Sequence, residues 1–388
     1  MISSRFDQKY IMVFLSIFAI SFLLSIALMQ FIAATLFILW IFEKNSEKRK
    51  SFDQITAFIF LFGLVRLITI FLSEYPQTSY EAIYKEALFY TSAVAVPFYL
   101  KNLDKQNLLK LVLVFILGAA VVSVIGSIRF FVGSVERAQT FSSGYTAFSG
   151  YLLSSLAAAL FYPKKINSMK GILFWSIVYA VIFIGLITSL GRANIAIAVF
   201  VFAVALLFKQ IPLKQIIVLG VIGLITFGIY LVHPSELIEN RVGNITYLSE
   251  RDIIWQGAKE ISLQHPLLGF GPRTFRQIFP FKEEFVDKKI GSWHNDFLQI
   301  YFESGILGLI AYLSLLWIII KTSVSHFRNN NIDPELKSLS RAALISIIAL
   351  LLSSLTSGFM TTAVLSMVFI FLVSLISRID FEVSNFSH

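Results

Sequence analysis

Long apolar blocks separated by short polar connections dominate the chain. The blocks are roughly 17–22 residues long, which suffices for a helix to cross a hydrocarbon core of about 30 Å. They lack the alternating polar faces that a large soluble core of helices would need. The pattern predicts an all-α integral membrane protein of about 12 transmembrane helices, at residues 10–25, 27–42, 52–73, 83–100, 109–132, 145–162, 170–188, 193–208, 214–232, 303–321, 341–357 and 361–377.

The first two blocks share one apolar run, residues 10–42, which is too long for one ordinary spanning helix. We expect a tight turn near residues 25–30; one long tilted helix is the alternative. Positive residues precede this run, but no small-residue cleavage site follows it. The first block is therefore predicted to be a retained span and not a removed signal peptide.

Basic residues alternate between the connections. With the N-terminus inside, the inner connections carry clusters of lysine, whereas the short outer ones hold only Lys85, Arg137 and Arg192. This is the bias that orients membrane proteins. It places both termini in the cytoplasm of a multi-pass protein. It also accounts for most of the formal charge of +9, so nucleic acid is not expected as a partner.

One connection is much longer than the others. Residues 233–302 contain prolines and charges, and the alternation places them outside, which in a diderm bacterium is the periplasm. Loops this long usually carry function. Three parts are therefore expected: spans 1–9 in residues 1–232, a large periplasmic loop with short helices and the candidate catalytic residues in 233–302, and spans 10–12 with a cytoplasmic C-terminus in 303–388.

Composition narrows the chemistry. The chain is 57% hydrophobic and 14% charged, and it has no cysteine. Disulfides, thiolate zinc sites, iron–sulfur clusters and cysteine nucleophiles are thereby excluded. No Asp-x-Asp motif or glycine-rich phosphate loop is present. Three carboxylates of the long loop could bind a cation, but lysines surround them, so a solvated loop is favoured and no metal or cofactor is expected: Glu283, Glu284 and Asp287.

The outer face is rich in arginine. Lysine suffices for a topology signal, whereas the planar guanidinium suits bidentate phosphate contacts. An anionic ligand is therefore expected there, most simply a phosphate or diphosphate. The outer arginines are Arg66, Arg129, Arg137, Arg192, Arg241, Arg251, Arg273 and Arg276.

The strongest of these candidates is Arg192, in the sequence SLGRAN between two spans, where the following helix begins and its N-terminal amides favour an anion. Arg251 opens an amphipathic stretch in the long loop, where pairing with a neighbouring carboxylate is the alternative. Arg66 lies inside a span and could instead extend outward to the membrane surface or pair with an outer glutamate such as Glu74 or Glu81.

Histidine supplies a candidate base. His294 lies in GSWHNDF just before a span, at the surface where a lipid-linked group would react, and histidine titrates near neutrality. A structural role is the alternative. Trp255 and Trp293 could stack on a sugar or only anchor the loop at the interface. His265, before a proline, is expected to shape the loop, as are the glycines of the sequence GFG.

Four segments together resemble the O-antigen ligase and polymerase family of polytopic membrane glycosyltransferases. They are ERAQTFSSGYTAFSGYL (136–152), TSLGRANIAIAVF (188–200), RDIIWQGAKEISLQHPLLGFGPRTF (251–275) and HNDFLQIYFESGILGL (294–309). The last is the most characteristic. One departure is Gly191, where family members often have serine before the arginine; a hydroxyl contact is therefore not expected there.

The resemblance implies metal-independent, inverting transfer of a glycan from undecaprenyl diphosphate to a lipid A–core hydroxyl, at the periplasmic face of the inner membrane. His294 would be the general base, and Arg192 and Arg251 would bind the diphosphate. Arg137, Arg241 and Arg66 are second-rank candidates for substrate binding, and membrane lipids would surround the protein.

Two other functions stay open at this point. A polymerase would use the same chemistry with a growing lipid-linked glycan as acceptor. A transporter of an anionic lipid or solute would be expected to show inverted repeats or paired broken helices near mid-membrane. Neither is evident in the sequence.

Overall fold

The computed structural model describes residues 4–164, 168–232, 251–283, 291–360 and 362–386, and over these residues it consists of α-helices and connections without strands. The helices of the first part are α1 (Gln8–Leu24), α2 (Ile26–Ile41), α3 (Asn45–Ser51), α4 (Gln54–Phe71), α5 (Pro76–Lys101), α6 (Lys105–Phe131), α7 (Tyr145–Phe161), α8 (Met169–Thr188), α9 (Arg192–Leu207) and α10 (Leu213–Val232). After them come α12 (Arg251–Ile261), α13 (Phe275–Ile278), α14 (Asp296–Arg328), α15 (Pro334–Ser354) and α16 (Ala363–Phe386).

Each of the twelve apolar ranges predicted from the sequence lies on one of these helices. Six described helices are long and apolar enough to cross a membrane: α4, α6, α8, α14, α15 and α16. Four more, α1, α2, α7 and α9, are apolar but shorter. The all-helical, multi-pass membrane class is therefore confirmed, while the number of twelve spans and the periplasmic loop stay predictions.

The break in the first apolar run lies at Ser25. This residue is extended (φ −157°, ψ 114°) between α1 and α2, and its hydroxyl accepts the Leu28 amide as the N-cap of α2. The alternative of one long helix is therefore wrong. Capping recurs at other helix starts, where side-chain oxygens accept backbone N–H groups that would lack a partner. These caps are Asp7, Asp53, Asp104, Ser168, Asn295 and Asp333.

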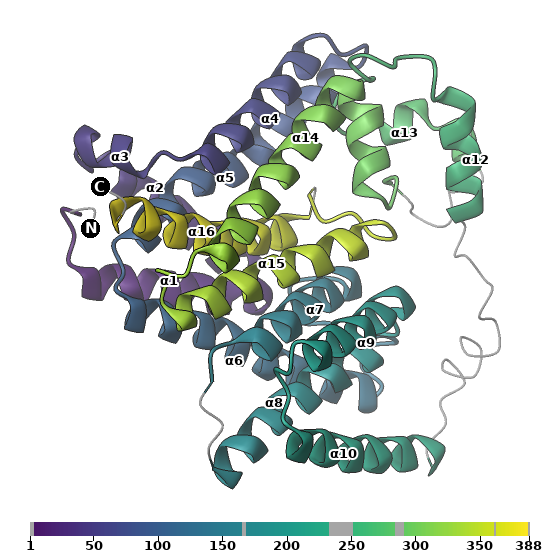
Figure 1. Ribbon diagram of the computed structural model, residues 1–388. Coiled ribbons are helices and arrows are strands. Elements are labelled where there is room, and N and C mark those ends of the chain that lie inside the picture. Colours follow the sequence, from purple (N-terminus) through teal and green to yellow (C-terminus); the bar gives the residue numbers. More distant parts are fainter. Residues whose placement is uncertain (1–3, 165–167, 233–250, 284–290, 361, 387–388) are drawn as a thin grey trace.

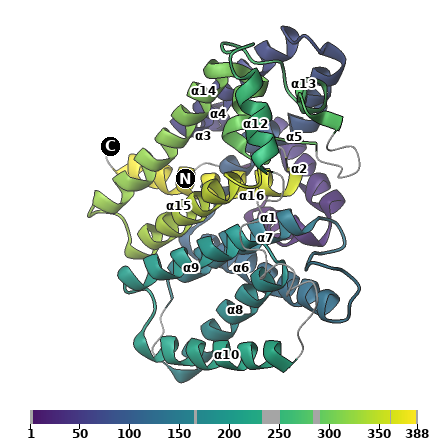
Figure 2. The same ribbon diagram turned by 90° about the vertical axis from the view of Figure 1, so that its right-hand side faces the viewer.

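The two ends of the bundle differ (Figure 1). Both chain termini and α3 lie at one end, which we call the terminal end. At the opposite end lie α12, α13 and the start of α14, and we call it the α12 end. Figure 2 looks onto the α12 end, where α12 lies in front of the helical bundle. The position of both termini at one end is what an even number of spans would give.

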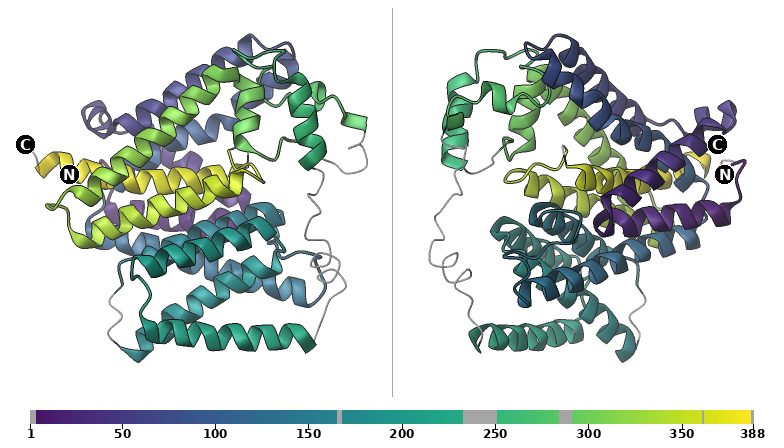
Figure 3. Two further views of the ribbon diagram at one scale, coloured as in Figure 1. Left: turned by 45° about the vertical axis from the view of Figure 1, so that its right-hand side comes forward. Right: turned by 180° about the vertical axis from the view of Figure 1, so that it is seen from behind.

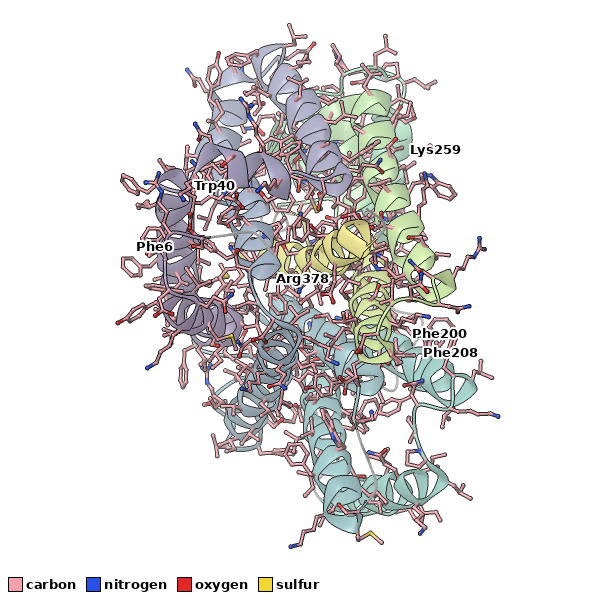
Figure 4. The ribbon with its side chains drawn as sticks, turned by 60° about the vertical axis from the view of Figure 1, so that its left-hand side comes forward. Phe6, Trp40, Phe200, Phe208, Lys259 and Arg378 are labelled. Carbon is pink, nitrogen blue, oxygen red and sulfur yellow. The ribbon has the colours of Figure 1, made fainter. Side chains whose placement is uncertain are left out.

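The core is formed by helices in the middle of the bundle. All residues of α7 from Ala147 to Phe161 are buried, and α7 packs against α15, α8 and α9. The helix α16 packs against α5 and α15 and is buried along most of its length. By contrast, α10 lies at the edge of the bundle and contacts α8 (Figure 3). Exposed aromatic side chains such as Phe200 and Phe208 project from the surface (Figure 4), as expected for helices in lipid.

Helix α14 begins earlier than the sequence predicted. Its first residue is Asp296, whereas the predicted span began at residue 303. The helix is also kinked, because Gly305 has non-helical dihedral angles (φ 62°, ψ −164°). The turns before the kink are polar and aromatic, so hydropathy alone did not assign them to a helix. They belong to the α12 end, where the candidate site lies.

Candidate functional site

Arg137 holds the break between α8 and α9. Leu190 in this break has a left-handed backbone (φ 54°), and α9 begins at Arg192. The Arg137 guanidinium donates to the carbonyl of Ser189 at 2.9 Å and to that of Leu190 at 3.2 Å. These carbonyls follow the end of α8, where helical partners run out. The outer-loop arginine thus fixes the chain that carries Arg192.

The start of α7 lies beside this break. The centre of the Arg137 guanidinium lies 3.2 Å from the ring centroid of Tyr145, the first residue of α7, which is a cation–π contact. Below it, buried Asn194 of α9 donates to Ser149 of α7 at 2.7 Å and accepts from Ser353 of α15 at 2.7 Å. These neutral hydrogen bonds lock the first turn of α9 into the bundle, so the backbone of Arg192 is held by its neighbours.

Arg251 reaches the same region from α12. Its guanidinium donates to the carbonyl of Thr356, just after α15, at 2.7 Å. Burial lowers the pKa of Arg251; Arg192 acts in the same direction, and Tyr145 opposes it. Arg192 and Tyr145 therefore both lie within electrostatic reach of Arg251.

His294 completes the group from the start of α14. The residue is half-buried and has a left-handed backbone (φ 49°). It immediately precedes Asn295, whose side chain caps α14 and donates to the Leu355 carbonyl at 3.3 Å. Burial, and then the positive charge of Arg251, lower the pKa of His294 below its usual value near 6.5. The imidazole is therefore neutral at neutral pH, the form in which it accepts a proton.

We call Arg137, Tyr145, Arg192, Arg251 and His294 the arginine–histidine cluster. Its members lie in the α6–α7 connection, in α7, α9 and α12, and in the segment just before α14. Segments far apart in the sequence thus come together at the α12 end. Arg137 and Arg251 each donate to backbone carbonyl oxygens of neighbouring connections. The arrangement can bind an anion through planar guanidinium groups beside a neutral base.

Arg66 has a different environment from the cluster. It is buried in α4 and forms ion pairs with Glu86 of α5 at 2.6 Å and with Glu303 of α14 at 3.0 Å. The alternative that Arg66 pairs with Glu74 or Glu81 is therefore wrong, because its partners are Glu86, further along α5, and Glu303. Glu303 also accepts the backbone N–H of Arg273 at 2.8 Å. Arg66 therefore joins α4, α5 and α14.

The two tryptophans differ in exposure. Trp255 is 53% exposed on α12, so its ring is open to solvent or lipid. Trp293 is 1% exposed; it stacks on Phe302 with ring centroids 4.0 Å apart and contacts the edge of Phe275. This placement favours packing over sugar stacking for Trp293, while a sugar contact of Trp255 stays a prediction. Arg241 lies outside the described residues.

The sequence GFG, residues 269–271, packs against the kink of α14 at Gly305. Phe270 and Gly271 donate their backbone N–H groups to the carbonyls of Phe302 and Glu303 at 2.8 and 3.1 Å. A Cβ at Gly305 would lie 2.1 Å from the Leu267 carbonyl oxygen, and one at Gly269 would lie 2.6 Å from the Phe302 carbonyl oxygen. The backbone of the sequence GFG therefore contacts the backbone of α14 at its kink. These contacts hold the first turns of α14, which begin two residues after His294.

Sequence reasoning missed three residues that shape this region. Tyr145 lies inside a quoted motif, yet nothing in its sequence context links it to Arg137. Asp296 is buried and accepts the Phe359 backbone N–H at 2.9 Å; its carboxylate directly after His-Asn was a usable signal. Glu303 is buried with Arg66 and was visible as a lone acidic residue in an apolar block. Within the described residues, no group of three or more His, Asp or Glu side chains is placed to hold a metal ion.

The central region of the chain is similar to known proteins. Residues 142–313 match a family described as O-antigen ligase. A protein of Rickettsia conorii, provisionally named a polysaccharide ligase, is 27% identical over 155 residues, which is 38% of this chain and 36% of that protein. Similarly named proteins of Rickettsia felis and Rickettsia typhi are each 28% identical over 141 residues.

These matches span only about a third of the length of each relative, 36%, 34% and 35%. The family match runs from the loop before α7 into α14 and so includes Tyr145, Arg192, Arg251 and His294. The resemblance of this chain to the O-antigen ligase family is therefore confirmed over residues 142–313.

Proposed function

We propose that this protein is a glycosyltransferase of the O-antigen ligase type. It moves a polysaccharide from undecaprenyl diphosphate to a lipid A–core hydroxyl at the periplasmic face of the bacterial inner membrane. The observation that carries the proposal is that Arg192 and His294 both lie within electrostatic reach of Arg251 at the α12 end. The similarity to proteins named polysaccharide ligases supports the reaction class.

The proposed chemistry needs one base and several cations. Neutral His294 takes the proton of the acceptor hydroxyl as its oxygen attacks the anomeric carbon of the donor sugar. The bond between this carbon and the diphosphate oxygen breaks, and the electron pair leaves with the diphosphate. Arg192 and Arg251 neutralise the charge that develops there, and Arg137 adds positive potential. Attack opposite to the leaving group inverts the anomeric centre.

Substitutions in the cluster test the assignment of roles. His294→Ala is expected to abolish polysaccharide transfer at normal protein levels, since the proposed base is lost. Arg192→Lys and Arg251→Lys keep the charge but lose the planar fork, so a roughly tenfold or greater loss of transfer is expected. The matched control is Lys259→Gln, at an exposed position on α12 (Figure 4). Full transfer in His294→Ala would overturn the proposed base.

A polymerase would employ the same cluster, with a growing lipid-linked glycan as acceptor. A deletion strain distinguishes the two on a lipopolysaccharide gel. A core without polymer, together with accumulated lipid-linked chains, is the result expected for a ligase. A core bearing a single repeat unit would identify a polymerase. The names of the relatives favour the ligase.

A further inference from the structure

A second polar region of the α12 end lies apart from the arginine–histidine cluster. It is a cavity of about 500 Å³ enclosed by α2, α4, α5, α14 and the start of α16, together with Arg273. This volume is within the range of sites that hold small-molecule ligands. None of the five residues of the cluster lines it. The cavity is therefore a site separate from the arginine–histidine cluster.

The wall of the cavity combines positive charge with apolar surface. Three cations line it, Arg66, Lys85 and Arg273, against one carboxylate, Glu86. Most other lining side chains are apolar or aromatic: Phe62, Leu88, Phe89, Ile300, Met360 and Met367. Cationic side chains beside an apolar wall match a molecule with an anionic head and a hydrocarbon part.

The three cations differ in how far they are already paired. Arg66 is held by Glu86 and Glu303, so it belongs to the framework. Arg273 has its Nε atom buried without a hydrogen-bond partner, although its backbone N–H is bound by Glu303. A buried donor without a partner costs free energy until a ligand accepts from it.

Lys85 forms an ion pair with Glu81, four residues earlier on α5, and both side chains are about two-fifths exposed. Exposed pairs of this kind contribute little, so Lys85 can turn to another anion at small cost. Glu81 also lies within electrostatic reach of Arg273. Arg273 and Lys85 are thus the cations that a ligand can engage.

Exposed lining residues show where the cavity opens. Gln30 on α2, Tyr84 and Lys85 on α5, and Ala363 at the start of α16 are exposed, whereas Phe62 and Phe89 are buried. The mouth is thus bordered by α2, α5 and the start of α16. Because the sides of these helices are expected to face lipid, a lipid can enter with its head at Lys85 and Arg273 and its chains along α5.

The connection between α15 and α16 contacts both the cavity and the arginine–histidine cluster. Met360 lines the cavity, and its backbone N–H donates to Asp296 at 3.3 Å, two residues after His294. A few residues earlier in the connection, the Thr356 carbonyl binds Arg251. One short connection and the start of α14 therefore contact both regions.

We infer that this cavity binds the phosphate head of a membrane lipid through Arg273 and Lys85. The binding itself does not depend on any reaction. The further step, that this lipid is the acceptor of the glycan, rests on the proposed function: a transferase with two lipid-borne substrates must hold both at once, and the cluster holds the donor diphosphate.

The test of binding uses the purified full chain and native mass spectrometry, with dioleoyl phosphatidic acid as the probe and dioleoyl phosphatidylcholine as the neutral-head comparison. The wild type is expected to retain phosphatidic acid in preference. The double variant Lys85→Gln/Arg273→Gln is expected to retain it about tenfold more weakly, because two charge-assisted contacts are lost. The matched control Arg276→Gln removes an exposed arginine that does not line the cavity.

A second variant guards against misfolding as the cause. Ala363→Phe fills the mouth without removing a charge and should lower retention as well. Equal retention in the wild type and in both cavity variants, or equal retention of the two lipids, would overturn the inference. Inorganic phosphate added in excess distinguishes the sources: displacement of the lipid would identify a free phosphate site and contradict a lipid site.

The role of the bound lipid as acceptor is tested separately by transfer kinetics. Lys85→Gln/Arg273→Gln should raise KM for the acceptor about tenfold, with KM for the lipid-linked donor unchanged. A raised KM for the donor instead would contradict the acceptor assignment. A different result would contradict the proposed function, namely full transfer in His294→Ala. That result would not affect the conclusion from the lipid-binding measurement.

Discussion

At the scale of single residues, Arg251 has two effects on the chemistry expected of His294. Its charge stabilises an anion nearby, and the same charge disfavours protonation of the imidazole, so the pKa of His294 is lowered. Burial of the ring acts in the same direction and is the larger cause. A base must be neutral to work, so both effects keep His294 active at a lower pH than an ordinary histidine would allow.

The sign of a pH shift follows from this pair. Transfer by a histidine base falls as pH falls through its pKa, so the acidic limb of the wild type should lie below 6.5, the usual value for histidine. Arg251→Gln removes the positive charge, so the pKa of His294 should rise and the limb should move to higher pH, apart from any loss of rate. The measurement is the pH profile of kcat/KM. A limb that stays in place or moves to lower pH would contradict the coupling.

At the scale of elements, the helices follow from the apolar blocks, and some breaks follow from local residues. Ser25 is polar and can cap a helix, and Gly191 precedes Arg192, so both breaks were visible in the sequence. The early start and the kink of α14 were not, because they depend on the distant sequence GFG crossing Gly305. The arginine–histidine cluster was likewise predicted only in part. The sequence motifs indicated Arg192, Arg251 and His294, but Tyr145 lies beside them only because of tertiary contacts.

The kink of α14 should tolerate no side chain at Gly305. Alanine there would adopt an unfavourable φ of 62°, and its Cβ would lie 2.1 Å from a backbone carbonyl oxygen. Gly305→Ala is expected to lower stability by about 2 kcal/mol or more. The matched control is Gly220→Ala on α10, where a Cβ meets nothing within 4 Å and helix propensity improves. Thermal unfolding in detergent measures both; equal midpoints would refute the close crossing.

The buried ion pairs of Arg66 should matter more than exposed ones. Arg66→Met leaves Glu86 and Glu303 without their shared cation, and breaking a buried pair costs about 3–5 kcal/mol. Lys85→Met breaks only the exposed pair with Glu81, which should cost less than about 1 kcal/mol. Unfolding midpoints of the two variants in the same detergent compare these costs. Similar small losses in both would show that Arg66 does not hold α4, α5 and α14 together.

At the scale of the whole molecule, the two ends use their cations differently. At the terminal end, lysines bind helix ends and carboxylates: Lys101 binds Asp53 at 2.8 Å, and Lys105 binds Asp333 at 2.7 Å. At the α12 end, arginines from separate elements gather beside His294. The formal charge of +9 is therefore divided between a topology signal and a candidate site, a division that the sequence indicated from the types and positions of the cations.

This division predicts which surface faces the periplasm, and the absence of cysteine from the chain makes a direct measurement possible. Single cysteines can be placed at exposed positions of the α12 end, Ser134→Cys and Gln264→Cys, and of the terminal end, Ser46→Cys and Asn331→Cys. In intact spheroplasts, a membrane-impermeant maleimide should label the first pair, and the second pair should react only after permeabilisation.

The orientation follows because clustered lysines resist translocation and keep the terminal end inside. Labelling of the terminal pair in intact spheroplasts would reverse the molecule and place the arginine–histidine cluster in the cytoplasm. A diphosphate-linked donor presented at the outer surface could then not reach His294, so the proposed transfer would fail together with the topology. If only one of the two positions at the same end is labelled, those two positions lie on opposite sides of the membrane. The number of spans between them must then be odd, and the twelve-span arrangement would be wrong.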